Sequence, residues 1–111
     1  MDLQAILNKT KSYFISVSDK DENVIDSIEK DLFEYKKEIV SGGNFFSKSG
    51  SDFFTKVLKE QELDQISLTS QETSILFIKN SSQELLFCIY SKNEINPNIV
   101  KLIIEKYDRS N

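Results

Sequence analysis

SILFIKNSSQELLFCIYSKNEINPNIVKLII, residues 74–104, carries the strongest structural signals in the chain. It contains most of two runs of β-forming residues, 73–79 and 84–91, whose nearly continuous apolar character is typical of central strands covered on both faces. A short polar turn separates the two runs, so they should pair antiparallel. Asn96 and Pro97 then open a helix, because asparagine caps first-turn amides and proline fixes φ where its missing N–H is not needed.

The helix that follows Pro97 has a wide apolar arc. Placed at 100° per residue, its apolar side chains cover about 200°; they are Ile99, Val100, Leu102, Ile103, Ile104 and Tyr107. An arc of this width predicts contact with both the sheet and a neighbouring helix.

Shorter patterns fill the amino-terminal half and complete the meander. Asp2 can cap a helix that ends near Asn8. The β-forming runs 12–18 and 23–28 predict a hairpin, and the alternating run 65–70 predicts a strand with one exposed face. These elements carry Leu3, Ile6 and Leu7 on the first helix, and Ile66 and Leu68 on one side of the strand.

The middle of the chain gives the least definite pattern. Residues 31–40 carry Leu32, Phe33, Tyr35, Ile39 and Val40 on one helical arc or extend the hairpin, and 29–50 as a whole is expected to be a loop or an extra helix. The clusters SGGN and SKSG predict loops at their glycines, Gly42, Gly43 and Gly50. A clearer helix is expected over 51–63, capped by Ser51 or Asp52. The predicted order is helix, two strands, helix, three strands, helix in a single α+β domain, residues 1–111.

Composition excludes several classes of function. The 111 residues carry a net charge of −4 with lysines scattered among acids, so neither nucleic acid nor an anionic membrane is an expected partner. No apolar run reaches the ~20 residues of a membrane span. There is no histidine, and the one cysteine, Cys88, lies in an apolar strand, so we expect a buried side chain in a reducing compartment and no nucleophile.

Two patterns of acidic residues could suggest a calcium site or a catalytic pair of carboxylates. Asp19, Asp21 and Asn23 match three positions of a calcium loop, but Val24 and Lys30 replace its glycine and its bidentate glutamate. The pairs Asp19/Asp21 and Glu60/Glu62 are not close to an expected pocket wall. The sequence therefore predicts no catalytic, cofactor-binding or metal-binding residue.

A partner interface is the better-supported prediction. The strand 65–70 should form the edge of the sheet, and no proline or charge blocks its pairing. The apolar face of the helix at 51–63 lies next to it in the chain. The predicted partner-binding residues are Phe53, Phe54, Val57, Leu58, Ile66 and Leu68.

Three stretches together resemble the roadblock/LC7 family. FISVSDKDENVI (14–25) is similar to its first hairpin, residues 65–96 to its closing three-stranded meander, and NPNIVKLIIEKYD (96–108) to its final helix. The hairpin turn has Glu22 and Asn23 where the family usually has glycine, although asparagine tolerates the left-handed conformation. Within the family, the similarity is greatest to the MAP-kinase scaffold subunits of the Ragulator (LAMTOR) complex.

The resemblance implies a fold and a function. It implies a five-stranded antiparallel sheet with the middle helix on one face and both terminal helices on the other, and dimerisation through the third strand and the middle helix. It further implies a non-catalytic scaffold that forms a heterodimer with another roadblock subunit. Such a pair would dock Rag-type small GTPases or MAP-kinase-pathway kinases in TOR and kinase signalling, and a partner would recruit it to the cytosolic side of late endosomes or lysosomes. The alternatives are a longin/profilin-like trafficking adaptor and another roadblock-type GTPase regulator.

Overall fold

The computed structural model describes residues 2–30, 34, 36–61, 64–80, 85–92 and 94–108. For residues 107 and 108 it describes only the backbone. Nine elements follow one another in the predicted order, with one addition, a π-helical turn η1. They are α1 (Leu3–Thr10), β1 (Phe14–Ser18), β2 (Val24–Glu29), α2 (Lys36–Asp52), η1 (Phe53–Val57), β3 (Gln65–Thr69), β4 (Ser74–Asn80), β5 (Leu85–Ser91) and α3 (Pro97–Asp108).

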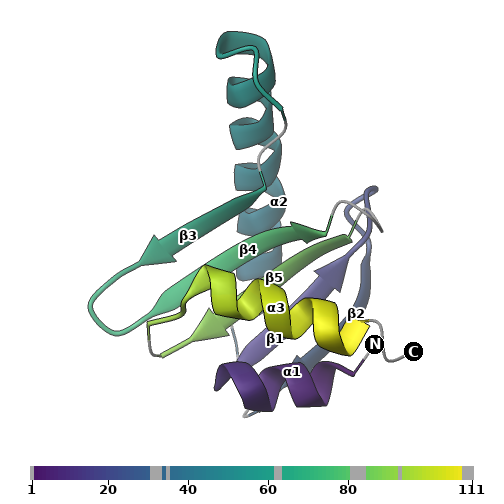
Figure 1. Ribbon diagram of the computed structural model, residues 1–111, viewed down its shortest axis with the longest axis vertical. Helices are drawn as coiled ribbons and strands as arrows, with labels where there is room; N and C mark the ends of the chain where they lie inside the picture. Colours follow the sequence, from purple (N-terminus) through teal and green to yellow (C-terminus); the bar gives the residue numbers. More distant parts are fainter. Residues whose placement is uncertain are drawn as a thin grey trace.

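The five strands form one antiparallel sheet in the order β2-β1-β5-β4-β3 (Figure 1). The two apolar runs of the stretch 74–104 are β4 and β5, which lie inside the sheet, as predicted. β3 is an edge strand, also as predicted, and β2 forms the opposite edge. The α+β class and the five-stranded antiparallel sheet are therefore confirmed.

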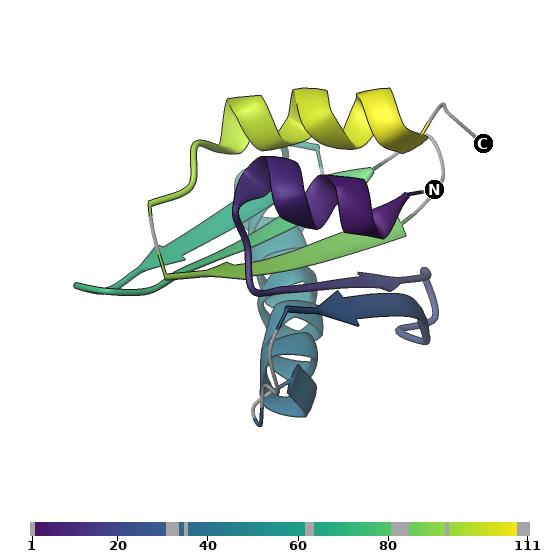
Figure 2. The same cartoon turned by 90° about the horizontal axis from the view of Figure 1, so that it is seen from below.

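Helices cover both faces of the sheet, as the resemblance implied (Figure 2). On one face, α1 and α3 pack against each other and against strand residues that include Ile15 and Ile89. On the other face, α2 places Ile39 against Phe14, Phe77 and Cys88. Alternate strand residues therefore belong to two separate apolar layers, which is why the central strands are apolar throughout.

Local hydrogen bonds define the ends of several elements. The carboxylate of Asp2 accepts a bond of 3.0 Å from the Ala5 amide at the start of α1. The side-chain oxygen of Asn96 accepts bonds from the Asn98 and Ile99 amides at 3.0 and 3.4 Å, so the predicted cap of the last helix is confirmed.

The middle of the chain departs from the prediction. α2 runs without a break through Gly42, Gly43 and Gly50, so the predicted loops there are wrong, and Asp52 makes no side-chain cap. Gly43 is needed for packing, because a Cβ at this position would lie 2.5 Å from Cε1 of Phe77. The helix can thus approach β4 closely only with glycine at this point. Of the residues 31–40, Leu32, Phe33 and Tyr35 lie outside the described residues.

The carboxy-terminal helix buries fewer of its apolar side chains than its wide apolar arc predicts. Val100 and Ile104 are buried in the core and Ile103 packs against it, but Ile99 and Leu102 are largely exposed. α1 packs against α3, and Ile99 and Leu102 lie on the part of the arc that no described element buries. The side chain of Tyr107 lies outside the described residues. None of the described helices has the length and apolar character needed to cross a bilayer.

Candidate functional site: a helix overhang beside an open sheet edge

α2 is longer than the sheet is wide. Five strands spaced about 4.8 Å apart span only about 20 Å. The 17 residues of α2 and the 5 of η1 extend roughly 30 Å at about 1.5 Å per residue. Since the helix runs across the strands, its carboxy-terminal end projects past the β3 edge (Figure 1). We call residues 53–58, at this projecting end, the overhang.

The overhang carries apolar side chains into solvent. Phe53 is 52% exposed, Val57 62% and Leu58 47%, whereas Phe54 is half-buried. A contiguous group of exposed aromatic and aliphatic side chains is a frequent mark of a contact surface. The sequence predicted an apolar face at these residues, but it placed them in the middle of a helix over 51–63. The helix instead ends here: a π-helical turn leads to Leu58, and Lys59 adopts a positive φ of 59°.

The apolar side chains of the edge strand β3 lie on the face of the sheet that α2 covers. In the antiparallel register, Ile66 faces Phe77 and Leu68 faces Ile75, and all of these side chains except Leu68 pack in the layer beneath α2. Ile66 is half-buried and Leu68 remains 39% exposed. On the far side of β3 no further strand is present among the described residues. The predicted residues thus lie on one side of the sheet, in two groups at the same edge.

Sequence reasoning missed two exposed aromatic residues, Phe45 and Phe46. Their rings meet edge to face with centroids 5.6 Å apart on the exposed surface of α2. Phe46 precedes Phe53 by seven residues, two turns, so both lie on the same flank of the helix. This spacing is visible in the sequence. Treating the glycine clusters as loops concealed it, because the seven-residue interval then crossed a predicted break.

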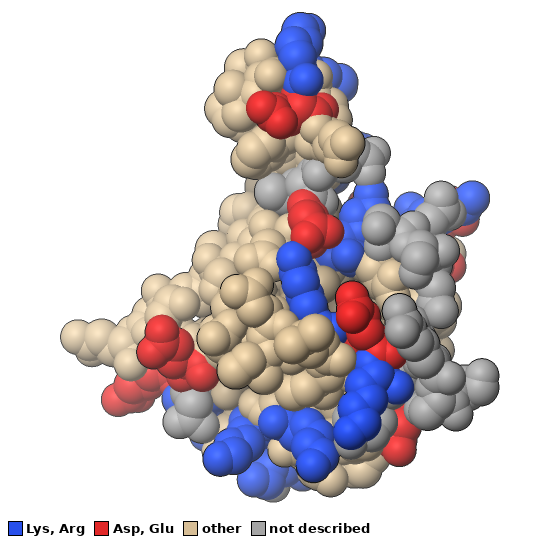
Figure 3. Space-filling view, in the orientation of Figure 1, with Lys and Arg blue, Asp and Glu red and all other residues tan. Residues whose placement is uncertain are grey.

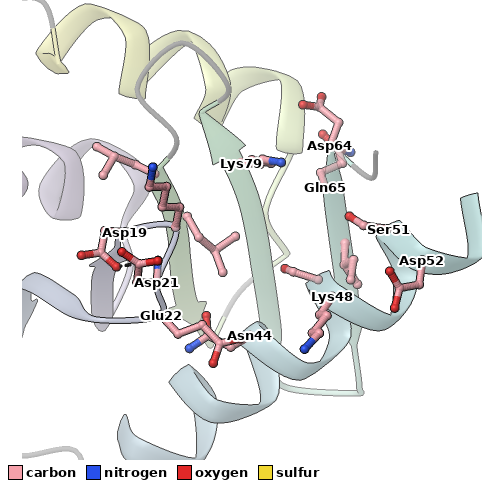
Figure 4. Close-up of a pocket in the computed structure, with 15 residues that line it drawn as sticks. Asp19, Asp21, Glu22, Asn44, Lys48, Ser51, Asp52, Asp64, Gln65 and Lys79 are labelled. Atoms are coloured by element: carbon pink, nitrogen blue, oxygen red, sulfur yellow. Dashed lines mark hydrogen bonds between the residues drawn. The ribbon is translucent and has the colours of Figure 1, made fainter. Parts of the chain in front are cut away.

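A cleft of about 600 Å³ opens on the other flank of α2 (Figure 4). Acidic residues of the β1–β2 turn line one side, polar residues of α2 line the other, and Ile66, Leu85 and Leu86 contribute apolar surface. The labelled lining residues are Asp19, Asp21, Glu22, Asn44, Lys48, Ser51, Asp52, Asp64, Gln65 and Lys79. No pattern in the sequence indicates that Asp19 and Asp21 line a cavity, because the cleft forms only when α2 packs across the sheet.

One carboxylate of this cleft, that of Asp19, is engaged in local structure. Asp19 accepts hydrogen bonds of 2.9 Å from the amides of Asp21 and Asn23, so it holds the turn together. The bond from the Asn23 amide is the main reason that the pKa of Asp19 is lowered, which is opposite to the raised pKa of a general acid. The left-handed residue of the turn is Glu22, with φ 68°, and not Asn23 as the family comparison suggested.

Two further acids of the cleft form ion pairs. Asp64 lies 2.6 Å from Lys101 of α3, and Asp52 lies 3.7 Å from Lys56. Within the described part of the chain, no three acidic, cysteine or histidine side chains group as metal ligands. The cleft is therefore a polar hollow in which the carboxylates of Asp19, Asp52 and Asp64 already have partners within the fold.

Cys88 behaves as predicted. Its side chain is buried under α2, and burial raises the pKa of the thiol to about 12. A thiol with so high a pKa is a poor nucleophile at neutral pH. Cys88 thus contributes packing to the layer that holds α2.

The fold is that of a known group of proteins. MglB from Myxococcus xanthus superposes with a TM-score of 0.72 at 15% identity, covering 91% of this chain and 80% of MglB. An MglB structure with a tetrameric arrangement gives 0.75 at 12% identity, covering 94% and 77%. A roadblock/LC7 domain from Streptomyces avermitilis gives 0.70 at 8% identity, covering 89% and 81%. The chain has the roadblock/LC7 fold.

Sequence comparison alone does not reach this result. No protein-family model matches the chain, and no curated protein matches it. At identities of 8 to 15%, the solved roadblock structures share the backbone architecture with this chain. What the roadblock-type chain does must therefore be argued from its own surface.

Proposed function

We propose that this roadblock-type chain is a non-catalytic subunit that pairs with a second roadblock domain through β3 and the overhang of α2. The observation that carries the proposal is the overhang itself. A helix end that projects past an open sheet edge lacks a sheet beneath it, and a second sheet joined at β3 would supply one. The tetrameric arrangement of one MglB structure supports the capacity of this fold to associate.

The edge strand is suited to such pairing. Gln65–Thr69 contains no charge and no proline, so an antiparallel strand can add to it by main-chain hydrogen bonds. Leu68 and the overhang would then be covered together. A stable interface of this kind buries at least about 800 Å² on each partner.

The partner we propose is a different roadblock subunit. The resulting heterodimer would act in a Ragulator-like complex as a scaffold for Rag-type small GTPases and MAP-kinase-pathway kinases, in TOR and kinase signalling. Its site of action would be the cytosolic side of late endosomes or lysosomes, where a partner recruits it. The support for these finer assignments is the similarity of residues 14–25, 65–96 and 96–108 to the family.

The test is isolation of the tagged chain from its own cells, followed by light scattering and identification of the bound subunits. The proposal expects a stoichiometric second roadblock chain, with small GTPases bound more weakly. SNAREs or tethering subunits in place of these would favour the longin/profilin-like alternative. A monomer that binds no roadblock protein would refute the pairing.

Location can be tested separately in the same cells. Breaking the interface by Val57→Asp should release a tagged chain from lysosomal puncta into the cytosol if a partner holds it there. Puncta that persist for a folded but unpaired variant would contradict recruitment through this interface.

A further inference from the structure

The fold gathers lysines that are far apart in the sequence. Lys30 at the end of β2 and Lys92 after β5 both lie over the ring of Tyr13, with their Nζ atoms 5.3 and 4.8 Å from its centroid. The two ammonium groups are therefore at most about 10 Å apart. Lys11, at the end of α1, lines a hollow together with Tyr13 and Lys30. We call Tyr13, Lys11, Lys30 and Lys92 the tyrosine–lysine site.

This arrangement differs from the expectation that the lysines are scattered among acids. Figure 3 shows several Lys or Arg side chains along the lower end of the molecule, below and beside α1, with others elsewhere on this face. Sequence reasoning could not find the cluster, because its members come from the ends of three elements that meet only in the folded sheet. The chain therefore has a local basic surface in spite of its net charge of −4.

The base of the tyrosine–lysine site is fixed by the sheet. The Tyr13 amide donates a 2.8 Å hydrogen bond to the Tyr90 carbonyl, and the Lys30 amide donates one of 2.9 Å to the Tyr13 carbonyl. The Tyr13 ring also meets the Tyr90 ring edge to face at 6.5 Å. A ring held in this way offers a fixed π-surface to the two ammonium groups, and cation–π contact restrains both lysine side chains in turn.

The three lysines have exposed side chains and no carboxylate partner among the described residues. Among the described residues, the acid that lines the same hollow is Glu29, and Lys36 pairs with its carboxylate at 2.7 Å. The hollow, of about 460 Å³, thus has two lining lysines, Lys11 and Lys30, with which no described carboxylate pairs. It is large enough to hold a small anionic group.

We propose that the tyrosine–lysine site binds a phosphate group, carried by a lipid headgroup or by a soluble phosphate monoester. A monoester carries about −1.5 to −2 charges at neutral pH, so one group can neutralise two neighbouring ammonium groups, which a single carboxylate cannot. The chain's remaining acids do not prevent this. The molecule is 39 Å long, and at about 0.1 M salt charges more than ~10 Å apart are largely screened.

The experiment uses the full chain in three parallel arms. Inorganic phosphate and glycerol phosphate are titrated while the ring resonances of Tyr13 are followed by NMR. Sedimentation measures binding to vesicles of phosphatidylcholine alone, with phosphatidylserine, or with phosphatidic acid. A single-stranded RNA is tested in the third arm. The proposal predicts shifts of Tyr13 with the soluble monoesters, or preferential binding to phosphatidic acid, and the arm that responds identifies the source.

Matched variants show whether the site is responsible. Lys30→Gln combined with Lys92→Gln should weaken binding by about 10- to 30-fold, since each lysine near an anionic surface contributes roughly fivefold. Lys48→Gln combined with Lys59→Gln changes the net charge equally, at positions away from the tyrosine–lysine site, and should have little effect. Circular dichroism confirms that both variants fold.

Several outcomes would overturn the proposal. These are no response in the soluble and vesicle arms at low salt, equal loss in both lysine variants, equal binding to phosphatidylserine and phosphatidic acid, and tighter binding to RNA. The inference is independent of the proposed pairing, because the site lies at the end of the molecule away from the overhang. Val57→Asp should therefore bind phosphate as the parent chain does.

Discussion

Val57→Asp should separate partner binding from folding. Val57 is 62% exposed at the overhang, so a charge there meets water in the isolated chain, and the free energy of unfolding should change by no more than about 0.5 kcal/mol. In a paired complex the same carboxylate would be buried without a counter-ion. The substitution should therefore weaken the complex without destabilising the isolated subunit.

The expected loss of affinity follows from two contributions. Covering the exposed part of a valine contributes about 1 kcal/mol, and an unpaired buried charge costs about 2–3 kcal/mol more. The sum of about 3–4 kcal/mol corresponds to a 100- to 1,000-fold weaker complex. Ser41→Asp is the matched control, because Ser41 is an exposed residue of α2 outside the overhang, and it should leave affinity unchanged.

The assay is co-isolation of the proposed roadblock partner from cells with each tagged variant, followed by titration of the purified subunits and by urea unfolding. We expect lost pairing for Val57→Asp with an unchanged unfolding midpoint. Retained affinity would show that the overhang is not part of the interface. A large drop in the unfolding midpoint would instead place Val57 in the core of the subunit.

Three further predictions concern the fold itself. Gly43→Ala should destabilise the chain by about 1–2 kcal/mol in urea unfolding, because the added methyl group would collide with the Phe77 ring, and an unchanged midpoint would show that α2 is displaced easily. Cys88 should resist a thiol reagent at neutral pH until the chain unfolds, since burial raises its pKa to about 12; rapid modification of the folded chain would contradict its placement. The lowered pKa of Asp19 means that its stabilising effect is present above its ordinary pKa of 3.8 and is lost as the pH falls through the lower folded value. Asp19→Asn should remove that part of the acid dependence, measured by hydrogen exchange in the β1–β2 turn, and identical acid profiles would refute it.

The strands and capped helices could be predicted from the sequence because their signals are local. The Asn96-Pro97 pair specifies the start of α3 through bonds within its own first turn. The apolar runs of β4 and β5 identify central strands because both faces of such strands are covered. The edge position of β3 followed from its alternation and from its place in the meander.

The course of α2 could not be predicted in this way. Adjacent glycines at 42 and 43 favour a break by local conformational freedom, whereas in the fold Gly43 is required by close contact with a residue 34 positions later in the chain, Phe77. Tertiary packing outweighed the local preference. The same packing created the cleft beside Asp19.

The predicted partner-binding residues were selected for their apolar character, and the geometry that brings them to one edge was not predicted. Phe53 and Leu68 were selected as separate features of a helix and a strand. Their common position at one edge depends on the length of α2 relative to the width of the sheet. The tyrosine–lysine site illustrates the same limit, since its lysines are brought together only by the strand order.

In the proposed heterodimer, a strand of a second roadblock domain completes the sheet at β3. Hydrogen exchange of the Gln65–Thr69 amides in the complex purified from cells measures this pairing. We expect slow exchange along β3 in that complex, and fast exchange at the outward-facing amides of the same strand in Val57→Asp. Equally fast exchange in the intact complex and in the variant would mean that β3 stays an open edge, and the proposed pairing would be wrong.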